Sequence, residues 1–263
     1  PPPSPPPPEF GISESSLTAA TLNDVALVSD AVGWLVGDSD FIAKTIDGGG
    51  TWATGRSGLP TPSEGLNRYA WHGIGMCSLR HGWIVGTFST IALTLDGGAT
   101  WQLQTGVNTE MERRLNAVQC VSAGVPTGLP ADPGPRTRDI AVAVGDGDVI
   151  LRTHNGGVTW TEQDSNTEGM NFLTVYFINS TWGWAAGTDP LRRILHTKTG
   201  GTSWNFQSYQ TGAGSLHRVV FAADGLMGWA VGKERLILKT SNGGVAWKAA
   251  GGNCGLEDRA GVA

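Results

Sequence analysis

The chain of 263 residues is poor in charge, and it has no long apolar run. Only 16% of its residues are charged, and 23 Asp and Glu outnumber 18 Lys and Arg, which gives a net charge of −5. Because a nucleic-acid-binding protein needs a basic face, this balance argues against that function. No run reaches the ~18 apolar residues of a membrane-spanning helix, so no membrane span is expected. Because the first residue is Pro and not Met, we expect that any signal peptide has been removed or lies upstream.

Cysteine is scarce as well. Cys77, Cys120 and Cys254 do not have the spacing of a metal-binding motif, and an odd number leaves at least one thiol free or bonded to another chain. No metal and no cofactor are expected. A helical period is also missing, and the 39 glycines favour turns over helices.

A repeat is the main feature that is present. Five stretches carry a Thr, a Gly-Gly pair and a Trp at fixed spacing, and the Trp residues follow one another at steps of 49, 59, 44 and 43 residues. A period of this size indicates stacked supersecondary units. The defining residues of the five stretches are Thr45, Asp47, Gly49 and Trp52; Thr94, Asp96, Gly98 and Trp101; Thr153, Asn155, Gly157 and Trp160; Thr197, Thr199, Gly201 and Trp204; and Thr240, Asn242, Gly244 and Trp247.

A second motif precedes each stretch. It reads Gly-Trp-Leu-Val-Gly at residues 33–37 and recurs with small changes at residues 82–86, 183–187 and 228–232, whereas residues 141–145 read Ala-Val-Ala-Val-Gly. Within one repeat, short apolar runs alternate with Gly, Asp and Ser clusters, which is typical of antiparallel strands joined by hairpins. Four strands in ~45 residues are typical of one β-propeller blade. Cys77 and Cys120 would lie on the first strands of successive blades, so a bridge between them is one option.

The predicted fold is therefore all-β. We expect a β-propeller of about five four-stranded antiparallel blades over residues 10–250, preceded by a polyproline II segment at residues 1–9 and followed by a tail at residues 251–263. Residues 10–20 are a candidate for an extra edge strand on the last blade. An insertion at residues 122–139 exceeds the usual loop length, and such loops are either functional or disordered.

Each Thr-to-Trp stretch has a structural explanation. Glycine supplies positive φ without steric penalty, the third residue can bond turn N–H groups through its side chain, and the Trp covers the turn. Because three of the five copies lack a carboxylate at the third position, neither catalysis nor metal binding is expected there.

The Thr-x-Asp-Gly-Gly-x-Thr-Trp pattern resembles the Asp-box, or bacterial neuraminidase repeat. Together with Gly-Trp-x-Val-Gly it resembles the photosystem II stability/assembly factor family over residues 22–250. That resemblance implies a propeller that acts as a scaffold for a photosystem protein in the thylakoid lumen. Members usually have seven blades, whereas five are visible here. The family is associated with an arginine-rich client surface, to which the doublets at residues 113–114 and 192–193 cannot be matched from the sequence.

The N-terminal run of prolines resembles the hydroxyproline-rich modules of extensins and of volvocine cell-wall glycoproteins. This resemblance implies O-glycosylated hydroxyprolines at Pro2, Pro3, Pro5, Pro6, Pro7 and Pro8, and the alternative is a bare polyproline II spacer. The sequon at Asn179 is a candidate N-glycosylation site. Both features favour the secretory route and an extracellular or cell-wall location, with the thylakoid lumen as the alternative.

Two rings of residues are candidates for binding. Because the first strand of each blade lines the channel, the residues that begin these strands should gather at one mouth; they are Asn23, Asp24, His72, Asn116, Thr174, His217 and Arg218. The alternative is a solvated rim. The residues just before each Asp-box Thr form a second ring, in which Lys44, Arg152, His196 and Lys239 accompany Leu93. This ring could anchor a carboxylate or sulfate, or its cations could pair with acids at strand ends.

Three functions remain open from the sequence. The first is a non-catalytic extracellular structural or interaction glycoprotein, a propeller head on a proline-rich rod, for assembly into cell-wall or fibrillar material or for adhesion. Its partners would be other protein chains, including copies of itself in a fibre, with glycans as covalent modifications. The alternative is a thylakoid-lumen photosystem II assembly scaffold. The second alternative is a sialidase-like glycoside hydrolase, which is disfavoured because only Tyr69, Tyr176 and Tyr209 could supply its nucleophile and no Arg-Ile-Pro motif is present.

Overall fold

The computed structural model describes residues 21–60, 69–104, 113–121, 139–209 and 215–250. The proline-rich segment, residues 10–20, residues 122–138 of the predicted insertion at 122–139 and the tail with Cys254 lie outside these ranges. Predictions that concern them are therefore not addressed by the structure.

The described chain forms five four-stranded antiparallel sheets, each built from four consecutive strands. The strands are β1 Leu22–Leu27, β2 Gly33–Gly37, β3 Phe41–Thr45 and β4 Ala53–Gly55 in blade 1; β5 Trp71–Met76, β6 Gly82–Gly86, β7 Ile91–Thr94 and β8 Gln102–Leu103 in blade 2; β9 Leu115–Cys120, β10 Ala141–Gly145, β11 Ile150–Thr153 and β12 Thr161–Glu162 in blade 3; β13 Asn171–Phe177, β14 Gly183–Thr188, β15 Arg193–Thr197 and β16 Asn205–Ser208 in blade 4; and β17 Leu216–Phe221, β18 Gly228–Gly232, β19 Ile237–Thr240 and β20 Lys248–Ala249 in blade 5. The predicted all-β fold of four-stranded blades is confirmed.

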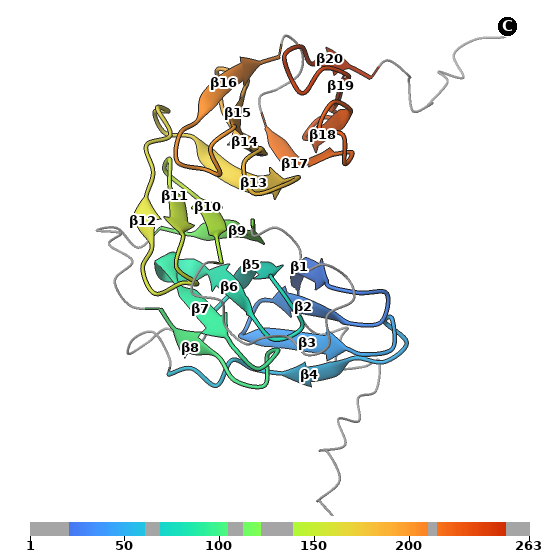
Figure 1. Cartoon of the computed structure of the whole chain (residues 1–263), viewed down its shortest axis with the longest axis vertical. Helices are drawn as coiled ribbons and strands as arrows, with labels where there is room; N and C mark the ends of the chain where they lie inside the picture. Colours follow the sequence, from blue (N-terminus) through green and yellow to red (C-terminus); the bar gives the residue numbers. More distant parts are fainter. Residues whose placement is uncertain (1–20, 61–68, 105–112, 122–138, 210–214, 251–263) are drawn as a thin grey trace, which may run out of the picture.

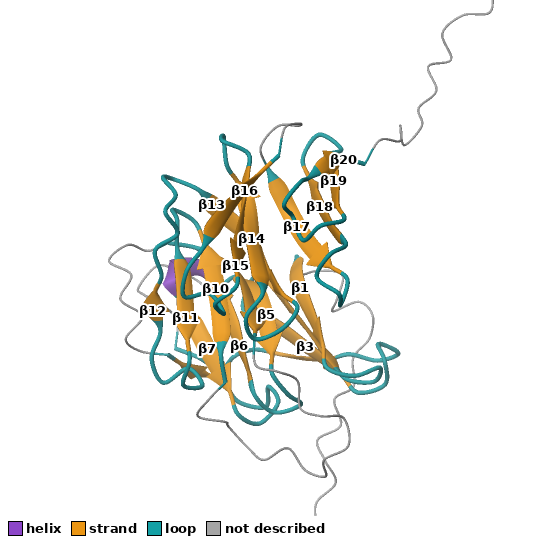
Figure 2. Cartoon of the chain, turned by 45° about the horizontal axis from the view of Figure 1, so that its top comes forward, coloured by secondary structure: helices purple, strands orange, loops and turns teal. Residues whose placement is uncertain are grey.

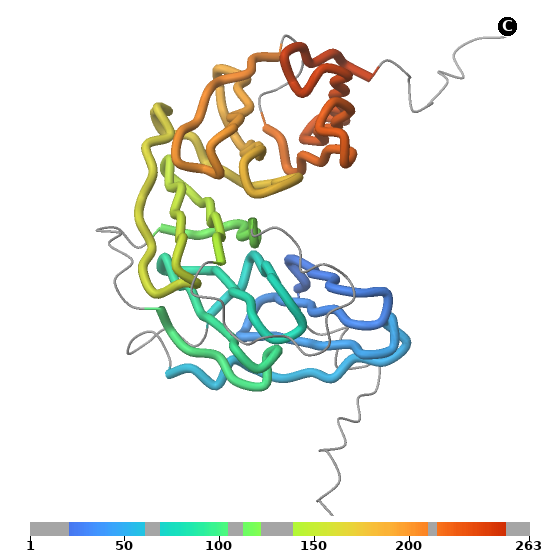
Figure 3. The backbone as a smooth tube through the Cα atoms, in the orientation of Figure 1, coloured from blue at the N-terminus to red at the C-terminus, as the bar shows by residue number. Residues whose placement is uncertain are grey.

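The five blades follow one another along an arc (Figure 1). The first strands β1, β5, β9, β13 and β17 contact one another in that order on the inside of the arc. The tube view shows the arc open on one side, between blade 5 and blade 1 (Figure 3). Nearly everything described is strand or loop (Figure 2), and the one helical turn in the described part, η2, spans only Thr87–Ser89.

The last glycine of the Gly-Trp-x-Val-Gly motif is required by a close backbone approach. A Cβ on Gly37 would lie 2.1 Å from the carbonyl oxygen of Thr21, and one on Gly187 would lie 1.9 Å from that of Asn171. At these places the first strand slips its register against the second strand. A bulge of this kind needs room that only glycine leaves.

The hydrophobic core is divided among the seams between neighbouring blades. Four buried clusters lie at the four seams, from blade 1 against blade 2 to blade 4 against blade 5. The motif tryptophans Trp34, Trp83 and Trp184 each point toward the following blade and are fully buried. Trp229 in blade 5 has no following blade among the described residues and is 38% exposed. Each blade is therefore stabilised by its neighbours.

Candidate functional site

The strand pairing gives every blade two distinct ends. The start of β1 pairs with the end of β2 at Leu22 and Gly37, whereas the end of β1 lies beside Gly33, which pairs with Thr45. We call the first end, with the starts of the first strands and the turns between second and third strands, the mouth end. The opposite end carries the Asp-boxes and is called the box end.

At the box end, the Asp-box Thr and the third box residue organise the turn. In blade 1 the Thr45 hydroxyl accepts a hydrogen bond from Gly49 N at 2.8 Å and donates one to Asp47 at 2.8 Å. The Asp47 carboxylate also accepts bonds from Thr51 N at 2.8 Å and the Thr51 hydroxyl at 2.6 Å. The hydrogen bond from the Thr51 hydroxyl is the main reason why the pKa of Asp47 falls to about 2.

Other side chains perform the same task in the later boxes. Asn155 accepts from Thr159 N at 3.0 Å, Asn242 accepts from Ala246 N at 2.9 Å, and the Thr199 hydroxyl accepts from Ser203 N at 3.1 Å. Because an amide or hydroxyl oxygen replaces the carboxylate, the third position needs an acceptor and not a charge.

The second predicted ring of cations does not converge on a common anion. Lys44 donates to the Gly97 carbonyl of blade 2 at 3.0 Å, and Arg152 donates to the Gly200 carbonyl of blade 4 at 2.8 Å. Each cation thus ties its blade to the Asp-box turn of the next blade. His196 instead stacks on Trp184 with ring centres 4.9 Å apart, and burial lowers its pKa to about 4. Lys44 and Arg152 lie at separate seams because each bonds to the following blade, and Lys239 lies over Trp229 of its own blade.

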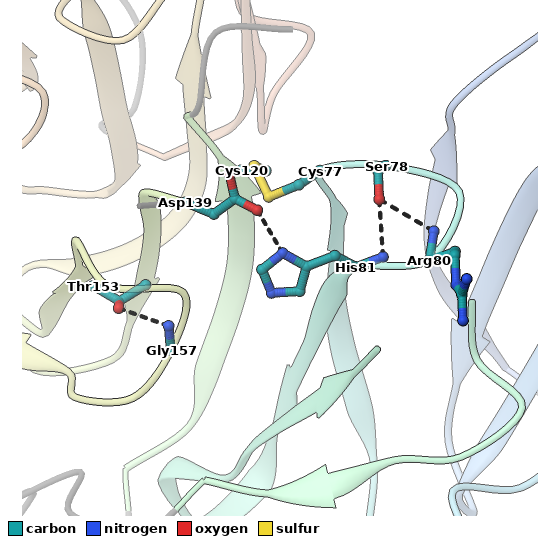
Figure 4. The surroundings of a disulfide bond; sticks show 8 residues. All are labelled: Cys77, Ser78, Arg80, His81, Cys120, Asp139, Thr153 and Gly157. Carbon is teal, nitrogen blue, oxygen red and sulfur yellow. Dashed lines mark hydrogen bonds and ion pairs between the residues drawn. A yellow bond between two sulfur atoms is a disulfide. The ribbon is translucent and has the colours of Figure 1, made fainter. Parts of the chain in front are cut away.

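The seam between blades 2 and 3 has a disulfide bond where two other seams have a hydrogen bond from Lys44 or Arg152 to the next Asp-box turn. Blade 2 carries Leu93 at the position of Lys44, and a disulfide joins Cys77 to Cys120 across the seam. Beside it, buried His81 bonds the buried carboxylate of Asp139 through Nδ1 at 2.5 Å (Figure 4). The disulfide is the bridge that the strand alignment offered as one option.

At the mouth end, two predicted asparagines connect neighbouring blades. The Asn23 amide donates to Asp38 at 2.8 Å and to the Trp71 carbonyl of blade 2 at 2.9 Å. Asn116 makes the equivalent bonds, to Asp146 at 2.8 Å and to the Phe172 carbonyl of blade 4 at 2.8 Å. These amides therefore have a structural role at the mouth.

An ion pair links the first and last blades at the mouth. Arg218 Nη1 of blade 5 lies 3.6 Å from Asp24 Oδ1 of blade 1, and the Arg218 side chain is 57% exposed. Asp24 Oδ2 also accepts a hydrogen bond from Ile74 N at 3.0 Å. Burial raises the pKa of Asp24, and the Ile74 N–H and the Arg218 guanidinium oppose that rise.

The remaining predicted mouth residues differ in access. His72 is half-buried beside Asn23, and its Nε2 is buried with no hydrogen-bond partner among the described residues. Burial lowers the pKa of His72, as does the positive charge of Arg114. Thr174 is 1% exposed, so it cannot contact a ligand, because the bulge turns it into the blade. His217 is exposed.

Several charged mouth residues were not among the predicted set. Asp38 and Asp146, which bond the two asparagines, lie in the turns between second and third strands, where the sequence pattern predicted only clusters of Gly, Asp and Ser that form turns. Both arginine doublets also lie at this end. Arg114 precedes β9 and lies 3.7 Å from Asp146, and Arg193 makes two bonds to Asp189 at 2.7 and 3.1 Å. Their placement depends on strand direction, which became clear only in the structure.

A sequence model of the family described as the photosynthesis system II assembly factor YCF48 matches residues 158–257, which contain blades 4 and 5. The family resemblance is confirmed. The match does not include residues 1–9, so the resemblance of the proline-rich segment to extensins stays a prediction. No curated protein matches the sequence.

Solved structures show a likeness of fold. Two structures of YCF48, one bound to a D1 peptide and one from Cyanidioschyzon merolae, are 17% identical with a TM-score of 0.47; the alignments cover 88% of this chain and 80% and 84% of theirs. An ancestral GH74 enzyme is 16% identical with a TM-score of 0.58, and the GH74 xyloglucanase from Xanthomonas campestris is 12% identical with a TM-score of 0.61. Each GH74 alignment covers 87% of this chain but only 31% and 38% of the enzyme. At these identities the likeness shows a β-propeller fold alone.

The family match favours the assembly-factor hypothesis over the extracellular one, which none of the comparisons supports. Among the described residues, no helix is long and apolar enough to cross a membrane. The sequon residue Asn179 is exposed in the turn between β13 and β14, where its side-chain oxygen accepts from Thr181 N at 2.9 Å and Trp182 N at 2.8 Å.

Proposed function

We propose that this chain is a non-catalytic protein-binding scaffold of the photosystem II assembly-factor type that works in the thylakoid lumen. The observation that carries the proposal is the family match over blades 4 and 5, the blades that supply Arg193 and Arg218 to the mouth end. The client surface in this proposal is the mouth end.

Exchangeable ion pairs give the mouth end a way to bind a client. Arg218 and Arg114 have side chains 57% and 48% exposed, and they lie 3.6 and 3.7 Å from their acidic partners. The Arg114–Asp146 pair is open to solvent on both sides and contributes only about 0–1 kcal/mol, whereas Asp24 is only 13% exposed. A client carboxylate can therefore replace Asp146 at Arg114 at small cost, or add to the exposed face of the Arg218 guanidinium, and form a charge-assisted hydrogen bond. Arg218 lies on β17 and Arg114 directly precedes β9, so packed strands position both arginines and little ordering is required on binding.

The test uses a fluorescein-labelled D1 peptide, because one of the structurally similar YCF48 proteins is bound to a D1 peptide. Fluorescence anisotropy measures its dissociation constant for the wild-type chain and for Arg114→Glu and Arg218→Glu. We expect saturable binding to the wild type and a dissociation constant at least about tenfold higher for each variant.

The matched control is Lys198→Glu, which makes the same charge change at an exposed Asp-box position at the opposite end. It should leave the affinity within about twofold of the wild type. Equal losses for Lys198→Glu and Arg218→Glu would indicate general electrostatic attraction and overturn the assignment of the mouth end. Absence of any binding would count against D1 as the client.

A further inference from the structure

A cavity of about 460 Å³ lies at the seam between blades 1 and 2, at the box end. We call it the seam pocket. Trp34 and Lys44 line it from blade 1, and Gly97 and Gly98 line it from the Asp-box of blade 2. Gly55 and Arg56, at the end of β4 and just after it, complete the site.

The pocket exists because one side chain is missing from blade 1. The third residue after the box Trp is Gln104 in blade 2, Gln163 in blade 3 and Gln207 in blade 4, whereas it is Gly55 in blade 1. A Cβ added to Gly55 would meet nothing within 4 Å. The hollow therefore follows from a single residue difference between repeats.

The equivalent seam between blades 4 and 5 shows what fills such a space. Gln207 donates through Nε2 to the Gly243 carbonyl at 3.1 Å and accepts from Trp247 Nε1 at 3.4 Å. At the seam between blades 2 and 3, Gln104 Oε1 lies 2.9 Å from where a Cβ of Gly157 would be. Gln163 instead bends back to bond Thr161. Two of the three glutamines thus place a three-carbon polar side chain against the next Asp-box.

The seam pocket has cationic groups around the space that the side-chain amides of Gln104 and Gln207 fill at two of the other seams. The Lys44 ammonium lies 5.0 Å from the Trp34 ring centre and donates one described hydrogen bond, to the Gly97 carbonyl. An ammonium group has three donors, so two remain for a ligand. Burial lowers the pKa of Lys44, and the Asp96 carboxylate opposes that shift. Exposed Arg56 adds a guanidinium at the rim.

We propose that the seam pocket binds a carboxylate on a short aliphatic stem, such as the side chain of glutamate, in the position that Gln207 occupies at the other seam. The carboxylate accepts hydrogen bonds from Lys44 and Arg56, and the stem packs on Trp34 and the glycine pair. Two cations select a carboxylate over an amide because charge-assisted hydrogen bonds are about twice as strong as neutral ones. The site is independent of the proposed client surface, since it lies at the box end.

Titration followed by ¹H–¹⁵N NMR tests the proposal on the intact chain. The probes are N-acetylglutamate α-amide, free glutarate and an extended acetylated tripeptide with a central glutamate; N-acetylglutamine α-amide is the neutral comparison. We expect saturable shifts of the Gly55, Gly97 and Gly98 amide signals with the carboxylates, and at least about tenfold weaker binding of the glutamine amide. Tighter binding of the tripeptide than of glutarate would identify a polypeptide as the source, and the reverse would identify a free small acid.

Three variants make the test specific. Gly55→Gln restores the missing side chain and should abolish the saturable shifts, whereas Gly55→Ala leaves the pocket open and should bind as the wild type does. Lys44→Leu, for which Leu93 in blade 2 is the precedent, should weaken binding at least about tenfold. Arg218→Glu at the mouth should leave the titration unchanged.

Equal binding by Gly55→Gln and Gly55→Ala would overturn the proposal. So would a glutamine amide that binds as tightly as the carboxylates, or unchanged Gly97 and Gly98 signals in the wild type. None of these results bears on the D1 peptide experiment, so the two proposals fail separately.

Discussion

The Asp-box threonines show how one hydroxyl can organise a whole turn. Thr153 is fully buried, and its Oγ1 accepts from Gly157 N at 2.9 Å (Figure 4) while it donates to Asn155 Oδ1 at 3.0 Å. Gly157 is tightly packed as well, since an added Cβ would lie 2.6 Å from Trp83 Nε1. Loss of the hydroxyl removes the acceptor that the Gly157 N–H uses in this turn.

Thr153→Val should therefore destabilise the chain although it keeps the side-chain shape. An unsatisfied buried N–H costs about 1–3 kcal/mol, and each kcal/mol corresponds to about 2–4 °C of Tm in a chain of this size. Thermal unfolding followed by near-UV circular dichroism measures the change. The control is Val158→Thr, an exposed position in the same box, which should leave Tm within about 1 °C. Equal Tm values for both variants would show that the hydroxyl is dispensable.

The Asp47 carboxylate leads to a prediction about pH. Its pKa is lowered from 3.8 to about 2 in the folded chain, so its contribution to stability is present above pH 3.8 and is lost as the pH falls through 2. Asp47→Asn keeps the acceptor oxygen, as in the boxes of Asn155 and Asn242, but cannot titrate. We expect the variant to lose less stability than the wild type between pH 5 and pH 2, as measured by urea unfolding at each pH. Parallel pH profiles would contradict this.

At the scale of elements, each of the four seams combines a buried hydrophobic cluster with specific bonds between the two blades. Lysine or arginine ties blades 1 to 2 and blades 3 to 4, whereas the Cys77–Cys120 disulfide and the His81–Asp139 pair join blades 2 and 3. Where the cation is replaced by Leu93, a covalent bond and a buried polar pair provide the connection.

Replacing both cysteines, as Cys77→Ser with Cys120→Ser, should weaken that seam. The disulfide closes a loop of 43 residues, for which the chain-entropy estimate is about 4 kcal/mol and the usual range about 2–4 kcal/mol. Urea unfolding of the oxidised wild type and the variant measures the difference. Dithiothreitol should lower the stability of the wild type to that of the variant and leave the variant unchanged; a reductant effect of equal size on both proteins would contradict the prediction.

The elements were more predictable from the sequence than their contacts. Turn residues and short apolar runs act locally, so the Gly-Trp-x-Val-Gly strand and the Asp-box hairpin could be placed without the structure. The role of Lys44 could not, because its acceptor is a backbone carbonyl 53 residues away. Asn23 and Asn116 were assigned to the mouth by strand alignment, but their bonds to the next blade depend on how the blades pack.

At the scale of the whole molecule, the described residues form no hydrophobic seam between the first and last blades, on the open side of the arc (Figure 3). The apolar side chains that would face one, Leu27 in blade 1 and Trp229 in blade 5, are 73% and 38% exposed. Among the described residues, the Asp24–Arg218 pair is the one ion pair between these two blades. The raised pKa of Asp24 shows that burial disfavours its charged form. Asp24 thus holds Arg218 in place at the expense of some stability near neutral pH.

Asp24→Asn should separate the stability cost of the buried carboxylate from its role in holding Arg218. An acid with a raised folded pKa loses stability as the pH rises above 3.8, so a neutral amide should leave the stability at pH 7 no lower than that of the wild type. The loss of the ion pair should nevertheless free blade 5 to move relative to blade 1.

Spin labels at Ile46→Cys and Val245→Cys, which are 71% and 80% exposed, report the distance between the two blades in a Cys254→Ser background. We expect a broader distance distribution by pulsed electron paramagnetic resonance in Asp24→Asn, and an unchanged one in the control Asp146→Asn, which removes an ion pair within blade 3. A distribution as narrow as that of the wild type would show that the arc keeps its shape through its four seams alone.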